Sequence, residues 1–197
     1  MRRALLALAL LGLAACREET VALPDPVTMT AEAVGHYCQM DLLEHPGPKA
    51  QVHLDGQPAP LFFSQVRDAV AYQRMPEQSH AIRAIYVNDM GAAESWEKTG
   101  ADNWISAATA QYVVGSSRTG GMGAPELVPF SDAAKAQQFA AVHGGRVLTL
   151  EAISDADVLT PLAGASDHGA EHDADHGAGD AGDYAERLRR LSQQAGG

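Results

Sequence analysis

Positive charge is scarce in this sequence. Its 197 residues include 14 lysines and arginines against 25 acidic residues, for a formal net charge of −11. Proteins that bind nucleic acids neutralise phosphates with clustered Lys and Arg, and the chain has no basic stripe. The composition therefore argues against a nucleic acid as partner.

Cysteine is also scarce, with two in the whole chain, Cys16 and Cys38. Two cysteines in a short exported chain would ordinarily suggest one disulfide. No Cys-x-x-Cys pair is present, which argues against a thiol oxidoreductase. The positions of the two cysteines therefore decide what each can do.

The amino terminus lacks an apolar run long enough to span a bilayer. Arg2 and Arg3 precede a short apolar stretch, Ala4–Leu11, and small residues lead to Cys16. This order is typical of a secretory signal, and Leu13-Ala14-Ala15-Cys16 looks like a lipobox, where a bacterial lipoprotein is cleaved just before its lipidated cysteine. A plain signal peptide cut elsewhere is the alternative.

Lipidation of Cys16 would leave Cys38 as the only thiol. Cleavage would also remove Arg2 and Arg3, which takes the formal net charge from −11 to −13. We expect a soluble domain tethered by lipid in the bacterial envelope and facing the periplasm. Arg17 follows the lipidated cysteine where an inner-membrane retention signal often has Asp, and this weakly favours the outer membrane.

Composition divides the chain into four segments. Residues 1–15 form the signal peptide, and residues 16–33, with Pro24 and Pro26, predict a lipidated terminus followed by an extended linker. Residues 34–160 predict the folded domain. Residues 161–197 predict an acidic, histidine-rich tail with a short terminal helix.

The folded domain is predicted as α+β. A hairpin is expected from Ala50–Leu54 and the run that begins at Leu61, then a helix capped by Ser64 that stops at Pro76, then a strand over Ile82–Val87. A similar order returns in the second half, where the expected elements are strands at Trp104-Ile105, Tyr112–Val114 and Leu127–Phe130, a helix capped by Ser131 and ended by Gly144-Gly145, and a strand over Arg146–Leu150. Phe63-Ser64 and Phe130-Ser131 hold equivalent places, so we predict a tandem ββαβ repeat.

The carboxyl-terminal tail has too little apolar surface to order itself. Six acidic residues and three histidines lie between Gly164 and Asp183, without Lys or Arg. The histidines, His168, His172 and His176, recur every four residues. They predict either an accessory site for Cu(II) or Zn(II), or a solvated acidic spacer.

The residues around Cys38 suggest a metal site. A lone thiol in an oxidising compartment is a liability unless it is buried, lipidated or used. In an extended chain, His36, Cys38 and Met40 would point to one face. Thiolate and thioether donors favour Cu(I), whereas zinc rarely accepts methionine. Core packing of Met40 is the alternative.

Two further side chains are candidate ligands. Met122 lies among three glycines and a proline, where a regular element is not expected, so it could supply another soft donor. His45, just before Pro46-Gly47, lies near Cys38 in sequence. Met90 is expected to fold back on the core. Three other histidines of the domain are not expected to bind metal. His53 is expected to be half-exposed on a strand, His80 to lie in a loop and His143 to lie in the last turn of a helix.

Several motifs together resemble one family. They are Tyr37-Cys38-Gln39-Met40, Glu44–Gln51, Phe63-Ser64-x-x-Arg67-Asp68-Ala69, Ile85–Gly91 and Gly120–Glu126. Over roughly Val34 to Leu159 the sequence resembles the NosL family of lipoprotein copper chaperones. Gln39 stands where that family commonly has glycine.

The resemblance implies Cu(I) bound by Cys38 and Met40, with Met122 as a further ligand. It also implies delivery of copper in the periplasm to nitrous oxide reductase, through a membrane ABC-type maturation complex, and a fold similar to the tandem ββαβ arrangement of organomercurial lyase. A mercury-cleaving enzyme would need more than one thiol, so no enzymatic activity is expected. The alternative function is a tethered buffer that sequesters copper or zinc without a client.

Overall fold

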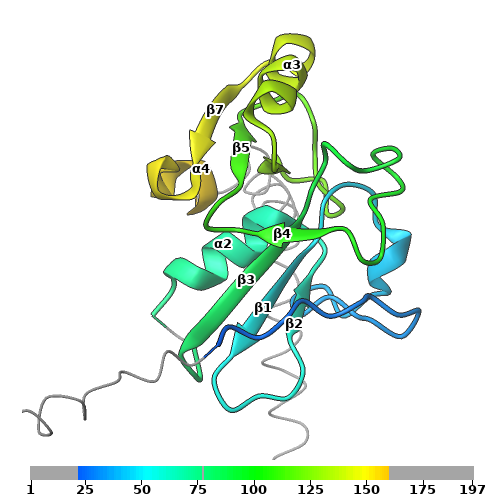
Figure 1. Ribbon diagram of the computed structural model, residues 1–197, viewed down its shortest axis with the longest axis vertical. Helices are drawn as coiled ribbons and strands as arrows, with labels where there is room; N and C mark the ends of the chain where they lie inside the picture. The colour runs from blue at the N-terminus through cyan, green and yellow to red at the C-terminus, as the bar shows by residue number, and fades with distance from the viewer. Residues whose placement is uncertain (1–21, 77, 160–197) are drawn as a thin grey trace, which may run out of the picture. The chain divides into compact units, whose positions relative to one another are not determined.

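The computed structural model describes residues 22–76 and 78–159 (Figure 1). The predicted signal peptide, Cys16 and the tail histidines His168, His172 and His176 lie outside these residues. Within the described ranges, no helix is both long and apolar enough to cross a membrane. The chain divides into two units, Met1–Ala152 and Ile153–Gly197, and the site lies in the first.

The first half of the domain is a four-stranded antiparallel sheet of order β2-β1-β3-β4. Its strands are β1 (Ala50–Leu54), β2 (Leu61–Phe63), β3 (Ile82–Asn88) and β4 (Trp104–Ser106). The β1 and β3 ranges agree with the predicted strands. Trp104-Ile105, which was predicted to open the second half, instead pairs with β3 and completes the first sheet.

One helix, α2 (Val66–Arg74), packs on β1, β2 and β3 (Figure 1). It ends as predicted before Pro76, whose ring cannot continue a helix. The predicted cap is wrong by one residue, because Gln65 occupies the N-cap position and makes no side-chain capping bond to the helix. That leaves the Gln65 side chain available for another partner.

The second half repeats the first. Strands β5 (Gln111–Val114), β6 (Val128–Phe130) and β7 (Arg146–Thr149) form an antiparallel sheet of order β6-β5-β7, with α3 (Ala133–His143) between β6 and β7 in sequence. Phe63 pairs with the first residue of β1 and Phe130 with the first residue of β5. The two ββαβ halves therefore share both strand order and register.

The start of α3 corrects another predicted cap. Asp132, not Ser131, caps the helix, through bonds from the amides of Ala134 and Lys135. Ser131 instead donates its hydroxyl to Asp89, which follows β3. Together with the bond from the Met90 amide to the Pro129 carbonyl (2.9 Å), this contact joins the two halves.

Helix α3 buries only part of its apolar surface. Phe139 packs against a cluster that includes Phe130 and Met90, so Met90 turns back to the core as expected. Ala136 is the fully buried residue of the helix, whereas Ala134 and Val142 are exposed. The helix ends as predicted at Gly144, where φ is +75°.

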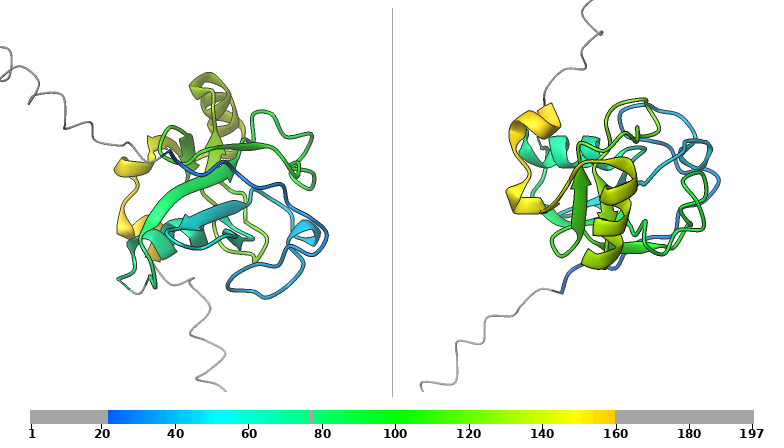
Figure 2. Two further views of the ribbon diagram at one scale, coloured as in Figure 1. Left: turned by 60° about the horizontal axis from the view of Figure 1, so that its bottom comes forward. Right: turned by 90° about the horizontal axis from the view of Figure 1, so that it is seen from above.

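Residues 22–33 form an extended segment that packs on the sheet rather than a free linker (Figure 2). The Gln51 side chain bonds both the N–H and the C=O of Val27, and the Tyr86 hydroxyl donates to the Pro24 carbonyl. Met29 joins Ala33 and Leu42 in a buried cluster with further apolar neighbours from β2 and β4. The packed domain thus begins upstream of Val34.

This segment also explains why His53 is buried rather than half-exposed. Successive side chains of a strand face opposite sides, so Gln51 and His53 of β1 lie on the face that the extended segment covers. His53 bonds Gln51 at 2.8 Å and contacts the Tyr86 ring edge-on. Burial lowers the pKa of His53, so the neutral imidazole is favoured.

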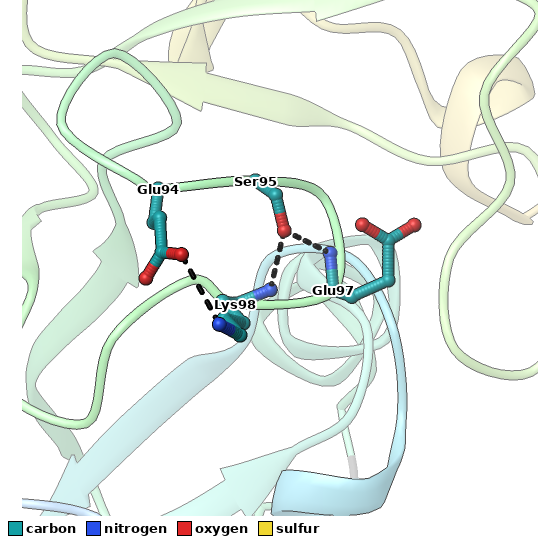
Figure 3. Close-up of polar contacts among 4 residues, drawn as sticks. All are labelled: Glu94, Ser95, Glu97 and Lys98. Atoms are coloured by element: carbon teal, nitrogen blue, oxygen red, sulfur yellow. Dashed lines mark hydrogen bonds and ion pairs between the residues drawn. The ribbon is translucent and has the colours of Figure 1, made fainter.

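The long connection between β3 and β4 is ordered by local polar contacts (Figure 3). Ser95 Oγ accepts bonds from the amides of Glu97 and Lys98, and Lys98 pairs with Glu94 at 3.1 Å. Trp96, in the same connection, accepts at its carbonyl from the Gly47 amide and stacks near Phe139. The connection therefore packs against the second half.

The described part of the second unit holds one short helix, α4 (Asp155–Leu159). It begins with a reciprocal capping box, in which the Ser154 amide donates to the Asp157 carboxylate and the Asp157 amide donates to Ser154 Oγ.

Candidate metal centre

Cys38 lies in a short closed loop. Val34 and Asp41 form an antiparallel bridge at the base of the loop, and the Gly35 amide donates to the Met40 carbonyl at 3.0 Å. Residues 36–38 form a turn, so the predicted extended arrangement with three side chains on one face is wrong. The bonds that close the loop, rather than alternation along a strand, set where Cys38 and Met40 lie.

Gln39 has the conformation that lets this loop close. Its φ is +55°, which makes it the one non-glycine residue with positive φ among the described residues. Its side-chain Nε2 donates to the His36 carbonyl at 2.7 Å, and its backbone amide donates to the Gly35 carbonyl at 2.8 Å. Gln39 thus holds the turn between the two candidate sulfur ligands.

The two sulfur side chains of this loop are accessible. Cys38 is a free, partly buried thiol, and Met40 is 44% exposed. An exposed thioether contributes little to packing, which disfavours core packing as the role of Met40.

The Cys38 loop is attached to the edge strand β2. Gly35 bridges Phe62, and the His36 amide donates to the Phe62 carbonyl at 2.6 Å. The His36 ring contacts the rings of Tyr37, Phe63 and Tyr72 with centroid distances of 5.2 to 5.7 Å. His36 therefore belongs to an aromatic cluster that fastens the loop to β2 and α2.

Met122 lies at the tip of a second closed loop. Thr119 and Pro125 form its base, and the Gly120 amide donates to the Ala124 carbonyl at 2.8 Å. Like Met40, Met122 is 44% exposed. The three glycines around it permit a tight turn but supply no side chains to anchor it.

Gln65 anchors this second loop, and sequence reasoning missed it. Its Oε1 accepts from the amides of Met122 (3.1 Å) and Ala124 (3.3 Å), although 57 and 59 residues separate the partners. Its Nε2 donates to Asp68 at 2.9 Å. The sequence around Gln65 gives no indication that its side chain bonds a loop more than 50 residues away.

The two loops are therefore held by nearby residues of one segment, at the end of β2. Phe62 holds the Cys38 loop, and Gln65 holds the Met122 loop, with two residues of chain, Phe63 and Ser64, between them. A Cβ on Gly121 would also lie 3.2 Å from the Ser64 carbonyl, which shows how closely the second loop approaches this segment. The end of β2 brings the Cys38 and Met122 loops into one neighbourhood.

His45 also contacts the Met122 loop. Its Nδ1 lies 3.2 Å from the Gly121 carbonyl, and its Nε2 is buried with no hydrogen-bond partner. Because a carbonyl only accepts, a neutral His45 ring carries its proton on Nδ1, which leaves the lone pair on Nε2. Metal-bound histidines commonly donate their other ring N–H to a carbonyl in this way.

Two ionisable residues near the loops are buried, Glu126 and Lys49. Glu126 Oε1 accepts from the amides of Arg67 and Leu127, while its Oε2 is buried and without a partner. Burial raises the pKa of Glu126 to about 8. Lys49 donates to the carbonyls of His45 and Gly47, and burial lowers its pKa to about 8.

The remaining predicted side chains lie elsewhere. His143 is in the last turn of α3, as expected, and contacts Phe139, and His80 is an exposed loop residue that bonds Ser79. No group of three or more His, Cys, Asp or Glu side chains suited to a metal occurs within residues 22–76 and 78–159. In this part of the chain the candidate centre thus depends on thioethers, which suit a soft ion.

Comparison with known proteins identifies relatives over the whole chain. The sequence model of the NosL family matches residues 26–158. A copper-binding lipoprotein NosL of Achromobacter cycloclastes is 54% identical over 198 residues, which cover 100% of this chain and 98% of the relative. Its counterpart from Stutzerimonas stutzeri is 36% identical over 164 residues, 82% of this chain and 83% of the relative.

A solved structure supports the same relationship. The crystal structure of the copper chaperone NosL from Shewanella denitrificans is 30% identical in sequence and superposes with a TM-score of 0.61. The match covers 68% of this chain and 99% of that protein.

Proposed function

The chain belongs to the NosL family, and from this premise we propose that it is a lipoprotein copper chaperone. It binds Cu(I) through Cys38, Met40 and Met122 and delivers the ion for maturation of the copper centres of nitrous oxide reductase. It is not an enzyme.

The observation that carries this proposal is that two sulfur-bearing loops are anchored to nearby residues at the end of β2. A free thiol and two exposed thioethers come from segments about 80 residues apart, held by Phe62 and Gln65. A thiolate with two thioethers matches the preference of Cu(I) and suits zinc or calcium poorly.

His45 is the nitrogen donor that we add to the sulfur set. Its proton is on Nδ1, toward Gly121, and its Nε2 has the free lone pair that a metal requires. Lys49 holds the carbonyl of the same residue. His36 has less support, since its ring contacts three aromatic side chains. The tail histidines, His168, His172 and His176, would form only an accessory Cu(II) or Zn(II) site.

The exposure of the sulfur ligands suits transfer rather than storage. Met40 and Met122 are each 44% exposed, so a partner's ligands can approach the ion before these thioethers leave. The partners we propose are nitrous oxide reductase and its membrane ABC-type maturation complex. Lipid on Cys16 would keep the domain at the periplasmic side of the envelope, with the outer membrane weakly favoured over the inner.

An anaerobic Cu(I) titration against a chromophoric chelator tests the binding step. Cys38→Ser and Met40→Leu should each weaken Cu(I) binding by at least about tenfold. Met75→Leu is the matched control, because Met75 is 41% exposed at the far end of α2. Deletion of residues 164–197 should leave the affinity unchanged. Loss of binding only on that deletion would contradict the proposal.

Transfer to the apo reductase tests the delivery step. A chaperone should give up its copper to the apo enzyme, and the reductase should gain the absorption of its copper centres. Copper that stays on the lipoprotein would instead support the alternative function, a tethered buffer with no client.

A further inference from the structure

We propose that Gln65 is a positioning residue for copper, which acts by setting where Met122 presents its sulfur. The inference rests on the proposed function, because it takes Met122 as a Cu(I) ligand. Gln65 itself donates no electron pair to the ion.

The geometry that supports this role is a two-amide clamp. Gln65 Oε1 accepts from the N–H of Met122 at 3.1 Å and from the N–H of Ala124 at 3.3 Å. One of these amides lies at the tip of the loop and the other where the chain returns, so one side-chain oxygen links the two parts of the turn that carries the thioether. Gln65 is 3% exposed, so water competes little for these hydrogen bonds.

A second contact orients the clamp. Gln65 Nε2 donates to the Asp68 carboxylate at 2.9 Å, one turn into α2. With the amide nitrogen committed to Asp68, the amide oxygen must face the loop. A flipped amide would set its NH₂ group against the N–H groups of Met122 and Ala124.

The side chains at the tip of the loop offer little anchorage of their own. Gly120, Gly121 and Gly123 carry no side chains, and the Met122 side chain is exposed rather than packed. A Cβ on Gly120 would lie 2.7 Å from Gln65 Oε1, so close approach of the loop to this oxygen requires glycine there. Without the clamp, copper binding would have to order a glycine-rich turn at an entropic cost.

The experiment is a double-mutant cycle on Cu(I) affinity with Gln65→Leu and Met122→Leu. Leucine removes the acceptor at similar volume, and loss of an outer-sphere partner typically weakens metal binding by about 10- to 100-fold. We expect Gln65→Leu to cause such a loss in the natural background and less than about twofold in the Met122→Leu background. X-ray absorption at the copper edge should count one sulfur fewer in Gln65→Leu.

A matched control tests whether the effect is specific to Gln65, and a milder variant covers the case in which Gln65→Leu does not fold. Gln78→Leu removes a glutamine that also donates to backbone carbonyls, at the opposite end of α2, and should leave Cu(I) affinity unchanged. Gln65→Asn keeps a polar amide but shortens it by one methylene, and should lower the sulfur count even if Gln65→Leu does not fold.

The outcomes separate this inference from the proposed function. An equal loss of affinity from Gln65→Leu in both backgrounds, or an unchanged sulfur count in Gln65→Asn, would overturn the positioning role. If Met122→Leu left the Cu(I) affinity unchanged, the positioning role would also be overturned. The proposed function would still stand in that case if Cys38→Ser weakened Cu(I) binding. Absence of Cu(I) binding in the natural protein would contradict the proposed function itself.

Discussion

The Sγ of Cys38 lies in the space that a Cβ on Gly35 would fill. Gly35 has no positive φ, so space rather than backbone conformation requires glycine there. The Gly35 backbone also accepts from Gln39 and donates to Met40 across the loop. One residue without a side chain thus makes room for the thiol and closes the turn that carries it.

Gly35→Ala should therefore displace the thiol of Cys38. Overpacking of this kind costs about 1–3 kcal/mol of unfolding free energy, and Cu(I) affinity should fall with it. Cys38→Ala in the same chain removes the obstructing sulfur, so the double variant should regain most of the lost stability. Chemical denaturation of the four proteins measures this coupling. Additive losses would show that Gly35 and Cys38 do not compete for space.

At position 39, glycine should be more stabilising than alanine. The φ of Gln39, +55°, strains any residue with a Cβ, and both substitutions remove the side-chain bond to His36. Gln39→Gly should therefore be more stable than Gln39→Ala by about 1 kcal/mol in urea denaturation. Gln138, exposed within α3, is the control, because alanine should be the more stable substitution there by a similar amount. The same order at both positions would contradict the strain at residue 39.

Glu126 should make stability fall as pH rises. Burial raises the pKa of its carboxyl from 4.5 to about 8, so the folded protein keeps a proton that the unfolded chain releases. The stabilisation is complete below about pH 4.5 and is lost progressively toward pH 8.

Glu126→Gln isolates this effect, because the amide keeps an acceptor for Arg67 and Leu127 without titrating. Between pH 5 and 7.5 the natural protein should lose at least about 1 kcal/mol of unfolding free energy relative to the variant. Subtracting the variant cancels the opposite slope from His53, and Lys49 acts mainly above pH 8. Parallel curves would contradict a protonated Glu126.

Salt should slow copper transfer more than it weakens copper binding. The chain carries a formal net charge of −11, which attracts a basic partner surface over long range. Stopped-flow transfer to the apo reductase should therefore slow as ionic strength rises, while the Cu(I) dissociation constant measured in parallel changes little. A transfer rate independent of salt would rule out electrostatic steering by the acidic surface.

Local sequence patterns were sufficient to predict most of the helices and strands. The apolar runs that became β1 and β3, the proline after α2 and the glycines after α3 all act within a few residues, so their effects can be predicted from neighbours alone. Helix starts were less certain, because the favoured cap residues Ser64 and Ser131 each precede the residue that occupies the N-cap position by one. Asp132 caps α3, and Ser131 bonds Asp89 from the other half instead.

Long-range contacts explain the predictions that were wrong. His53 lies in a strand with polar alternation, and only the docking of residues 22–33 buries it. His36 and Cys38 were expected in an extended chain, but bonds to Gly35 and Phe62 bend that segment into a turn. Each outcome depends on residues that are distant in sequence or on a closure that periodicity does not encode.

The sequence by itself determined the candidate ligands, because a cysteine with a neighbouring methionine and a second methionine among glycines can be read directly from the chain. Tertiary structure decided which of them come together and what holds them. Phe62 and Gln65 bring the Cys38 and Met122 loops to the end of β2, and the Gly121 carbonyl sets the tautomer of His45. These contacts join segments tens of residues apart, and those that Gln65 and His45 make to the Met122 loop exist only because the two halves pack together.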